Sequence, residues 1–403
     1  MFPRTNAAAH ARRLAAQILA ILTLLCGSAA GQERKREDFQ TSAPFAILIE
    51  AESGTVLFEK SADQLMHPSS MAKLMTAEVV FRAIRDGQIK PEDEIVISEN
   101  AWRKGGAPSG GSTMYAQLNS RVKIDDVLRG IIIQSANDGC IAIAEAMAGN
   151  EPAFAAIMTK RARELGLTKS RFTNSTGLPD PDLLVTSREL ATLARHLIRT
   201  YPEYYKLYGE REFTWNRIRQ QNRNPLLAMG IGADGLKTGY TKEAGYGLVG
   251  SAVQNGLRLV VVVNGLKTAK DRADEARKLL DWGYRAFESR LLFAEGETVG
   301  EAKLFGGERG RVSLTGAGAI RMLVPRGSQE KLVARIVYSG PVAAPVTKGQ
   351  SIGTLRVWRG DRVAMETPLL AAEDVGAGGI TQRAFDAATE LVIGLFRAGA
   401  ERI

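Results

Sequence analysis

The stretch MHPSSMAKLMTAEVV, residues 66–80, places a serine one helical turn before a lysine. Ser70 and Lys73 stand at positions i and i+3, so both lie on one face of a helix and can reach each other. Apolar residues recur at helical spacing, which predicts a buried helix that ends at Gly87: Met71, Leu74, Met75 and Val79. A serine hydroxyl is a poor nucleophile until a base takes its proton, and the candidate base here is Lys73.

A lysine serves as a base only when its amine is neutral, and burial beside another cation lowers its pKa. Lys237 in GLKTGY is the candidate for that second cation. It opens a Lys-Thr-Gly motif at a predicted strand edge, where Lys237 and Thr238 offer a charge and a hydroxyl to a carboxylate. Gly239 permits a ligand to approach the strand closely. These residues predict a site for an acid-terminated substrate.

A third motif, Ser135-Ala136-Asn137, follows three isoleucines in IIIQSANDGC, so its polar residues stand at the end of a buried segment. Ser135 is a candidate for passing a proton between Lys73 and a leaving amine, and Asn137 for binding a substrate amide. The same short motifs recur in exposed-looking turns and loops, where a structural role is expected: Ser328 with Lys331, Ser120 with Lys123, and Ser98 with Asn100. By contrast, the motifs that begin at Ser70, Ser135 and Lys237 follow one another along the chain, and each stands at the boundary of a predicted helix or strand.

The N-terminus resembles a secretory signal peptide, with arginines before an apolar run and small residues near Ala30. We therefore expect a signal peptide over 1–30, cut after Ala30, and a polar tether over 31–43. The alternative is an uncleaved anchor, for which the apolar run is short. Cleavage removes three arginines and no acidic residue, which lowers the net charge from +9 to +6. The basic residues are spread along the chain, which argues against nucleic-acid binding.

Histidine and cysteine are too scarce for several kinds of site. Cleavage at Ala30 leaves two histidines, His67 and His196, and no His-Glu-x-x-His motif exists, so we expect no metal and no other cofactor. Cys140 is then the single cysteine, which excludes an internal disulfide, and its apolar helical setting predicts a buried, inert thiol.

The remaining pattern predicts an α+β catalytic domain over 44–292. A hairpin turns at residues 52–54, helices follow from 124 to 202 around a loop NSTGLPDPD, and a second hairpin turns at Asn255-Gly256. A last helix is expected over 271–288. Strands at both ends of this region with helices between them predict one sheet covered by helices. The Gly-rich stretch 103–113 is expected to be a flexible surface loop.

Two further segments follow the catalytic domain. Short strand-like runs separated by Gly and Pro predict a small β-sandwich-like domain over 296–376. An amphipathic helix over 380–400 follows a glycine spacer, and we expect it to lie in a membrane interface. The alternative is a helix that docks on its own domain.

The motifs SMAK, SAN and KTG, with longer stretches such as DGLKTGYTKEAGYGLVGSA and LLDWGYRAFE, resemble those of the low-molecular-mass D-alanyl-D-alanine carboxypeptidases. These belong to the penicillin-binding protein and serine β-lactamase superfamily, in the peptidase S11-like family. The resemblance covers the mature chain. It implies a β-lactamase/transpeptidase-like domain, an antiparallel sheet covered by helices plus an all-helical lobe.

The resemblance also implies a role for each motif residue. Ser70 would be the acyl-ester nucleophile and Lys73 its general base, with Ser135 as proton relay and Asn137 holding the peptide. The substrate carboxylate would bind Lys237, Thr238 and Gly239 with help from Arg223, and the backbone N–H groups of Ser70 and Tyr240 would form the oxyanion hole. Some members carry histidine where this chain has Tyr240, a departure that bears on rate, pH profile and β-lactam preference.

The implied protein is an exported, periplasmic enzyme attached peripherally to the outer face of the cytoplasmic membrane. Its partners would be the peptidoglycan stem pentapeptide, β-lactams as acylating inhibitors and the membrane surface through residues 380–400. Three alternatives remain open: a class A-like serine β-lactamase, a DD-endopeptidase and a non-catalytic cell-wall binding protein. The β-lactamase string ExxLN is absent between Asn137 and Lys237.

Overall fold

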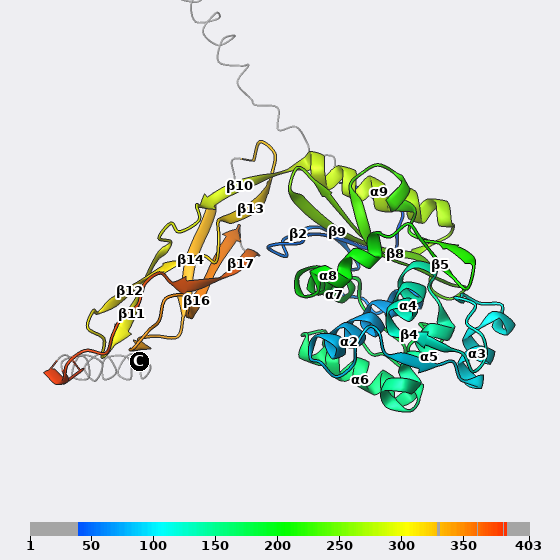
Figure 1. The fold of residues 1–403 in the computed structure, drawn as a ribbon. Helices are drawn as coiled ribbons and strands as arrows, with labels where there is room; N and C mark the ends of the chain where they lie inside the picture. Colours follow the sequence, from blue (N-terminus) through cyan, green and yellow to red (C-terminus); the bar gives the residue numbers. More distant parts are fainter. Residues whose placement is uncertain (1–38, 329–330, 361, 382, 385–403) are drawn as a thin grey trace, which may run out of the picture. The chain divides into compact units, whose positions relative to one another are not determined.

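The computed structural model describes residues 39–328, 331–360, 362–381 and 383–384 (Figure 1). The predicted signal peptide, most of the tether, and the predicted amphipathic helix except for its first few residues lie outside the described residues. Within the described part, no helix is long and apolar enough to cross a membrane.

A five-stranded antiparallel sheet in the order β2-β1-β9-β8-β7 forms the centre of the first domain. Its strands are β1 (Phe45–Glu50), β2 (Val56–Lys60), β7 (Ala233–Thr241), β8 (Gly245–Gln254) and β9 (Leu257–Leu266). The first strand pairs with the last, so both ends of the region meet in one sheet, as the sequence predicts. Both predicted hairpins are confirmed, at 52–54 and at Asn255-Gly256.

Helices cover both faces of this sheet (Figure 1). Side chains alternate along β1, so Leu48 packs toward Gly283 of α9 (Ala269–Ala286), while Ile47 and Ile49 join the core shared with α7 (Ser187–Thr200). The predicted last helix is confirmed, although it ends two residues early because Phe287 begins the next strand.

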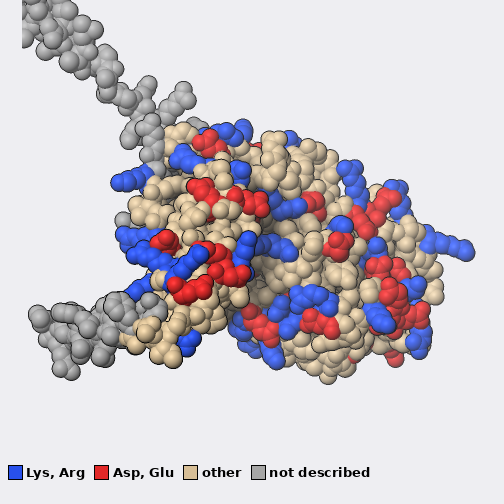
Figure 2. Space-filling view, turned by 60° about the vertical axis from the view of Figure 1, so that its left-hand side comes forward, with Lys and Arg blue, Asp and Glu red and all other residues tan. Residues whose placement is uncertain are grey.

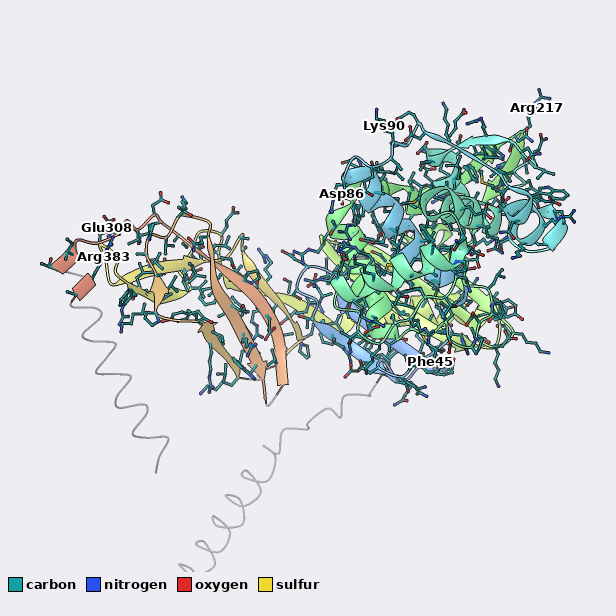
Figure 3. The ribbon with its side chains drawn as sticks, turned by 90° about the horizontal axis from the view of Figure 1, so that it is seen from below. Phe45, Asp86, Lys90, Arg217, Glu308 and Arg383 are labelled. Atoms are coloured by element: carbon teal, nitrogen blue, oxygen red, sulfur yellow. The ribbon has the colours of Figure 1, made fainter. Side chains whose placement is uncertain are left out.

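The helical lobe lies between the two halves of the sheet in sequence. Its helices are α2 (Lys73–Arg85), α3 (Glu99–Gly105), α4 (Ile124–Arg129), α5 (Asn137–Ala148), α6 (Glu151–Glu164) and α8 (Pro202–Tyr205). Two small two-stranded antiparallel sheets join it: β3 (Glu94–Val96) with β4 (Arg121–Lys123), between which α3 lies in the sequence, and the hairpin of β5 (Glu212–Trp215) with β6 (Ile218–Gln221). Figure 3 shows Arg217 pointing away from the tip of the β5–β6 hairpin.

A buried carboxylate connects three helices, α2, α6 and α7. Glu78 of α2 is 0% exposed and accepts hydrogen bonds from Arg161 of α6 (2.8 Å) and Tyr201 at the end of α7 (3.1 Å). His196 of α7 lies 3.2 Å from the same oxygen. The helix that carries Lys73 is therefore held by a buried charge pair as well as by apolar packing.

The Gly-rich segment 103–113 differs from its prediction as a flexible loop over its first part. Residues 103–105 complete α3, and a 3-10 turn follows at Ala107–Ser109. A Cβ on Gly105 would lie 2.4 Å from the backbone nitrogen of Asp138, so this glycine permits α3 to pack against the start of α5.

The second domain contains only strands among its described residues, and its apolar side chains form a core of their own. β10 (Phe287–Phe293) pairs with β13 (Ile320–Pro325). The other sheet has the order β14-β16-β17-β12-β11-β15: β11 (Gly300–Phe305), β12 (Arg311–Thr315), β14 (Leu332–Tyr338), β15 (Val342–Ala343), β16 (Ser351–Arg359) and β17 (Arg362–Ala371). The strand-like runs in the sequence are confirmed, whereas β10, β11 and β15 were not predicted.

Figure 2 shows lysine and arginine interspersed with aspartate and glutamate over the visible face. The even spread predicted from the sequence holds on this face, which carries no continuous basic surface.

Candidate active site

Ser70 lies in a short 3-10 turn, Ser69–Ala72, which leads directly into α2. Ser69 has a φ of +44°, a left-handed conformation that is uncommon for a residue with a side chain. Gly239 of β7 lies against this turn: a Cβ there would be 2.7 Å from Ser69 Oγ and 2.9 Å from the Pro68 carbonyl oxygen. The glycine of Lys-Thr-Gly thus lets the edge strand approach the turn that carries Ser70.

Lys73 lies one turn along and is 1% exposed. Its Nζ is 3.0 Å from Ser70 Oγ and 2.8 Å from Asn137 Oδ1, and it also donates to the carbonyl oxygen of Thr176. Burial lowers the pKa of this amine to about 8, and the positive charge of Arg223 acts in the same direction. The predicted contact between the serine and the lysine is present, with a depressed pKa as base chemistry requires.

The loop at 174–182 contributes to this site, which sequence reasoning missed. Thr176 supplies the carbonyl oxygen that Lys73 contacts. Gly177 has a φ of +78°, and a Cβ on it would lie 2.0 Å from the Ser69 carbonyl oxygen. Asn174 Oδ1 accepts from the backbone N–H groups of Thr176 (3.1 Å) and Gly177 (2.7 Å), which fixes the loop. The predicted loop is confirmed, and it packs directly on the serine turn.

The second motif begins after a π-helical turn, Gly130–Gln134. Ser135 adopts a φ of +66°, is buried, and its Oγ has no hydrogen-bond partner among the described residues. Asn137 starts α5, and its backbone N–H donates to the Ser112 carbonyl oxygen (2.8 Å). The structure therefore brings Asn137 into contact with Lys73 and places Ser135 two residues before it.

Asp138, a further residue that the sequence did not single out, fixes the segment facing this motif. Its carboxylate accepts from Thr113 Oγ1 (2.6 Å) and from the backbone N–H groups of Met114 (3.1 Å) and Ala116 (3.3 Å). Burial raises the pKa of this carboxyl group although the hydrogen bonds oppose the shift. A buried acid thus holds residues 113–116 beside Asn137.

Four cationic side chains influence one another at the other side of the site. Burial lowers the pKa of Lys237 well below its ordinary value, and the charges of Lys73, Arg223 and Arg272 add to this shift. Arg223 donates to Ser112 Oγ (2.6 Å). Thr238 is buried beside Lys237 on β7. This concentration of positive charge is suited to an anionic group of a ligand.

Arg272 was also missed, because in the sequence it is one more polar residue of an amphipathic helix. Its guanidinium lies 5.6 Å from the centre of the Tyr246 ring, and its Nε is buried with no partner among the described residues. Tyr246 in turn stacks on Tyr240, with ring centres 4.1 Å apart. Tyr240, the position that departs from some family members, is 53% exposed.

The residues expected to be structural have structural partners. Ser98 caps α3 by accepting from the Ala101 N–H (3.0 Å), and Ser120 donates to the Gln117 carbonyl oxygen (2.7 Å). Cys140 is buried, and burial raises the pKa of its thiol to about 12, so it is protonated and inert at neutral pH. His196 contacts Glu78, as expected for a structural histidine.

Comparison with known proteins identifies the family of this chain. The profile of the D-alanyl-D-alanine carboxypeptidase family, peptidase S11, matches residues 31–268, and that of the penicillin-binding protein 5 C-terminal domain matches residues 287–377. D-alanyl-D-alanine carboxypeptidase DacC of Escherichia coli is 38% identical over 370 residues, which are 91% of this chain and 92% of that protein.

Two solved structures have a similar fold. Penicillin-binding protein 5 from Haemophilus influenzae is 36% identical, with a TM-score of 0.74 over 84% of this chain and 98% of that chain. Penicillin-binding protein D2 from Listeria monocytogenes, in its ampicillin-bound form, is 28% identical, with a TM-score of 0.56 over 61% of this chain and 99% of that chain. The chain belongs to the D-alanyl-D-alanine carboxypeptidase family, peptidase S11, and carries the C-terminal β-domain of penicillin-binding protein 5.

Proposed function

We propose that this protein is an exported serine carboxypeptidase that removes the terminal D-alanine from peptidoglycan stem pentapeptides through an acyl-Ser70 intermediate. The observation that carries the proposal is the position of Lys73 Nζ, buried and in contact with Ser70 Oγ, Asn137 Oδ1 and the Thr176 carbonyl oxygen. No metal or organic cofactor takes part in the proposed reaction.

The contacts of Lys73 explain how it would activate the serine. Asn137 Oδ1 and the Thr176 carbonyl oxygen only accept hydrogen bonds, so they take both N–H groups of a neutral amine. The lone pair is then left facing Ser70 Oγ, 3.0 Å away, and can accept its proton. Ser70 Oγ attacks the carbonyl carbon of the penultimate D-alanine while that proton moves to Lys73.

Collapse of the tetrahedral intermediate breaks the carbon–nitrogen bond and leaves the acyl ester on Ser70. The leaving amine takes a proton, which Ser135 would pass on, since its buried hydroxyl has no other partner among the described residues. Water then hydrolyses the ester, which restores Ser70 and releases the shortened peptide. The approach of β7 to the Ser69 turn supports an oxyanion hole made from the backbone N–H groups of Ser70 and Tyr240.

The terminal carboxylate would bind at the cationic side of the site, on Lys237 and Thr238 with Arg223 as helper. Gly239 would keep the strand close to Ser70. Arg272 joins Lys237 and Arg223 as a third cation of this set, because its Nε lacks a partner among the described residues and its charge acts on Lys237. Asn137 would hold the peptide amide of the substrate.

A pentapeptide digest tests the proposal by mass spectrometry. The wild-type protein should release one D-alanine, and Ser70→Ala should release none. Ser120→Ala is a matched control, since Ser120 stands in the same Ser-x-x-Lys spacing, but among the described residues its hydroxyl donates only to the Gln117 carbonyl oxygen. Release of D-alanine by Ser70→Ala, or its loss in Ser120→Ala, would contradict the assignment.

The alternative activities are separated in the same experiments. A β-lactamase would turn over penicillin rapidly instead of keeping a long-lived adduct, an endopeptidase would cleave cross-linked dimers, and a binding protein would not be labelled by fluorescent penicillin. The loop that contacts Lys73 offers it a backbone carbonyl rather than a carboxylate, which favours the carboxypeptidase over a class A-like enzyme. Crystals of the Listeria relative contain ampicillin, so β-lactam acylation of Ser70 is part of the proposal.

Export and membrane attachment complete the proposal and rest on the sequence pattern. We expect a periplasmic protein held at the outer face of the cytoplasmic membrane by residues 380–400. Deletion of residues 380–403 should release it into the soluble fraction with its peptidase activity intact. Membrane association that survives this deletion would remove the anchor assignment.

A further inference from the structure

Asn264 is a buried polar residue in an apolar strand. It follows four consecutive valines, 260–263, on β9 and is 1% exposed. Side chains alternate along a strand, so Asn264 lies on the same face as Val260 and Val262, which belong to the core shared with the helical lobe. A buried amide is costly unless it is hydrogen-bonded, so its partners indicate what it does.

The Asn264 amide is directed at the segment that leads into the serine turn, Ser69–Ala72. Nδ2 lies 3.1 Å from the His67 carbonyl oxygen and 3.2 Å from Met66 Sδ. Both partners accept hydrogen bonds, so they require the nitrogen of the amide rather than its oxygen. The side chain therefore holds two consecutive residues that stand shortly before Ser70.

Two glycines leave the space that this arrangement needs. Gly239 and Gly247 are opposite each other on β7 and β8. A Cβ on Gly239 would lie 2.7 Å from Ser69 Oγ, and a Cβ on Gly247 would lie 2.2 Å from Asn264 Oδ1 and 2.6 Å from Met71 Cε. Because neither position has a side chain, the sheet lies close to the serine turn, and the Asn264 amide can reach the residues before it.

The geometry of the serine turn depends on contacts from other elements. Ser69 has a φ of +44°, a conformation that a residue with a side chain adopts only when its surroundings hold it there. On one side the Met66 N–H donates to the Val185 carbonyl oxygen (2.8 Å), and Gly177 packs on the Ser69 carbonyl. Asn264 supplies a contact from the central sheet.

We propose that Asn264 is a positioning residue for acylation. By holding the His67 carbonyl, it keeps Ser70 Oγ within reach of Lys73 Nζ, 3.0 Å away. It acts through the serine turn and not on the substrate. A misplacement of about 1 Å can slow a catalysed reaction about a hundredfold, so one hydrogen bond to this segment can control the rate. The inference rests on the proposed function, in which Ser70 is the nucleophile.

Asn264→Leu removes the amide N–H groups and keeps the shape of the side chain. Stopped-flow labelling of the intact protein with a fluorescent penicillin separates the dissociation constant of the noncovalent complex from the rate constant of acylation. The rate constant should fall about ten- to a hundredfold. The dissociation constant should stay within about twofold, because the cations that bind the carboxylate are unchanged.

Tyr284→Phe is the matched control. The Tyr284 hydroxyl of α9 donates to the Ala252 carbonyl oxygen of β8 (2.6 Å), so this variant also loses a donor to a backbone carbonyl, but on the face of the sheet that α9 covers. It should lower the urea midpoint of unfolding, as Asn264→Leu does, and leave the rate constant of acylation unchanged. A general loss of stability would slow both variants alike.

Asn264→Asp tests the hydrogen bond itself. Burial favours the protonated form of a carboxyl group, whose O–H can donate to the His67 carbonyl oxygen as the amide does. At pH 6 this variant should therefore be labelled faster than Asn264→Leu. Labelling that is no faster would show that the donor is not what the serine turn needs.

These measurements separate the inference from the proposed function. A rate constant for Asn264→Leu equal to that of Tyr284→Phe, or a loss that lies wholly in the dissociation constant, overturns the inference and leaves the proposed function intact. Asn264→Ala takes the place of Asn264→Leu if the latter does not fold, with the same expected loss. Wild-type protein that penicillin does not label at Ser70 refutes the proposed function itself.

Discussion

In the proposed mechanism, the pKa of Lys73 determines how the acylation of Ser70 depends on pH. An ordinary lysine has a pKa of 10.5, whereas burial brings that of Lys73 to about 8. At pH 7 about one amine in eleven is then neutral, against about one in three thousand for an ordinary lysine. Burial thus raises the concentration of active base about 300-fold at this pH.

The rate of acylation should follow this neutral fraction. The second-order rate constant should rise about ninefold from pH 6 to 7 and about fivefold from 7 to 8, and should not rise further between 9 and 10. The assay is stopped-flow labelling with a fluorescent penicillin, with the protein's fold checked at each pH. A rate constant that keeps rising tenfold per unit up to pH 10, or is flat from 6 to 8, would refute the assignment of Lys73 as base.

Glu151→Gln provides a shifted profile for comparison. The negative charge of Glu151 raises the pKa of Lys73 and so opposes burial. The glutamine removes the charge but keeps the oxygen that accepts from Ser175 Oγ (2.6 Å). The midpoint of the profile should therefore move to lower pH, and a shift to higher pH would contradict the stated electrostatics.

Three further substitutions test contacts around the site. Gly177→Ala should lower the rate of Ser70 acylation by about a hundredfold or more and the free energy of unfolding by about 1–3 kcal/mol. The reason is that Gly177 has a φ of +78° and that a Cβ would lie 2.0 Å from the Ser69 carbonyl oxygen. A near-normal rate of labelling with fluorescent penicillin would show that the loop does not hold the serine turn. Arg161→Ala should lower the free energy of unfolding in urea by about 3–5 kcal/mol, because it removes the cation that lies 2.8 Å from the buried Glu78 carboxylate. A decrease below about 1 kcal/mol would mean that the pair is solvated. Thr113→Val removes the 2.6 Å hydrogen bond to Asp138 and should cost about 1–3 kcal/mol, whereas Thr192→Val, which loses only an exposed bond, should cost about 0.5 kcal/mol or less.

Local signals account for the parts of the fold that the sequence predicts. The hairpin at Asn255-Gly256 depends on residues that tolerate positive φ, and both have it, at +50° and +77°. The pairing of Ser70 with Lys73 follows from helical spacing alone. These features require only neighbours in the chain, so their prediction did not depend on the tertiary structure.

The missed residues act through contacts that no local pattern marks. Thr176, 103 residues from Lys73 in the sequence, accepts a hydrogen bond from Lys73 through its backbone carbonyl oxygen. Because every residue type has this carbonyl, the sequence does not mark Thr176 as part of the site. Asp138 fixes residues 113–116 through the Thr113 hydroxyl and the backbone N–H groups of Met114 and Ala116, which are far from it in the sequence. The first part of the Gly-rich segment is helical instead of flexible, because Gly105 lets α3 pack against the start of α5. Arg272 is placed by the packing of α9 on the sheet, and its helical pattern gives no sign of the site.

A direct titration of Lys73 tests the central claim. Protein labelled with ¹³C at the lysine Cε position gives a resonance for each lysine, and Lys73→Arg and Lys237→Arg identify the two in the site. The Lys73 resonance should titrate with an apparent pKa of about 8, far from the ordinary 10.5. A Lys73 amine that stays protonated up to pH 10 would show that it cannot take the proton of Ser70, and the proposed mechanism would fail.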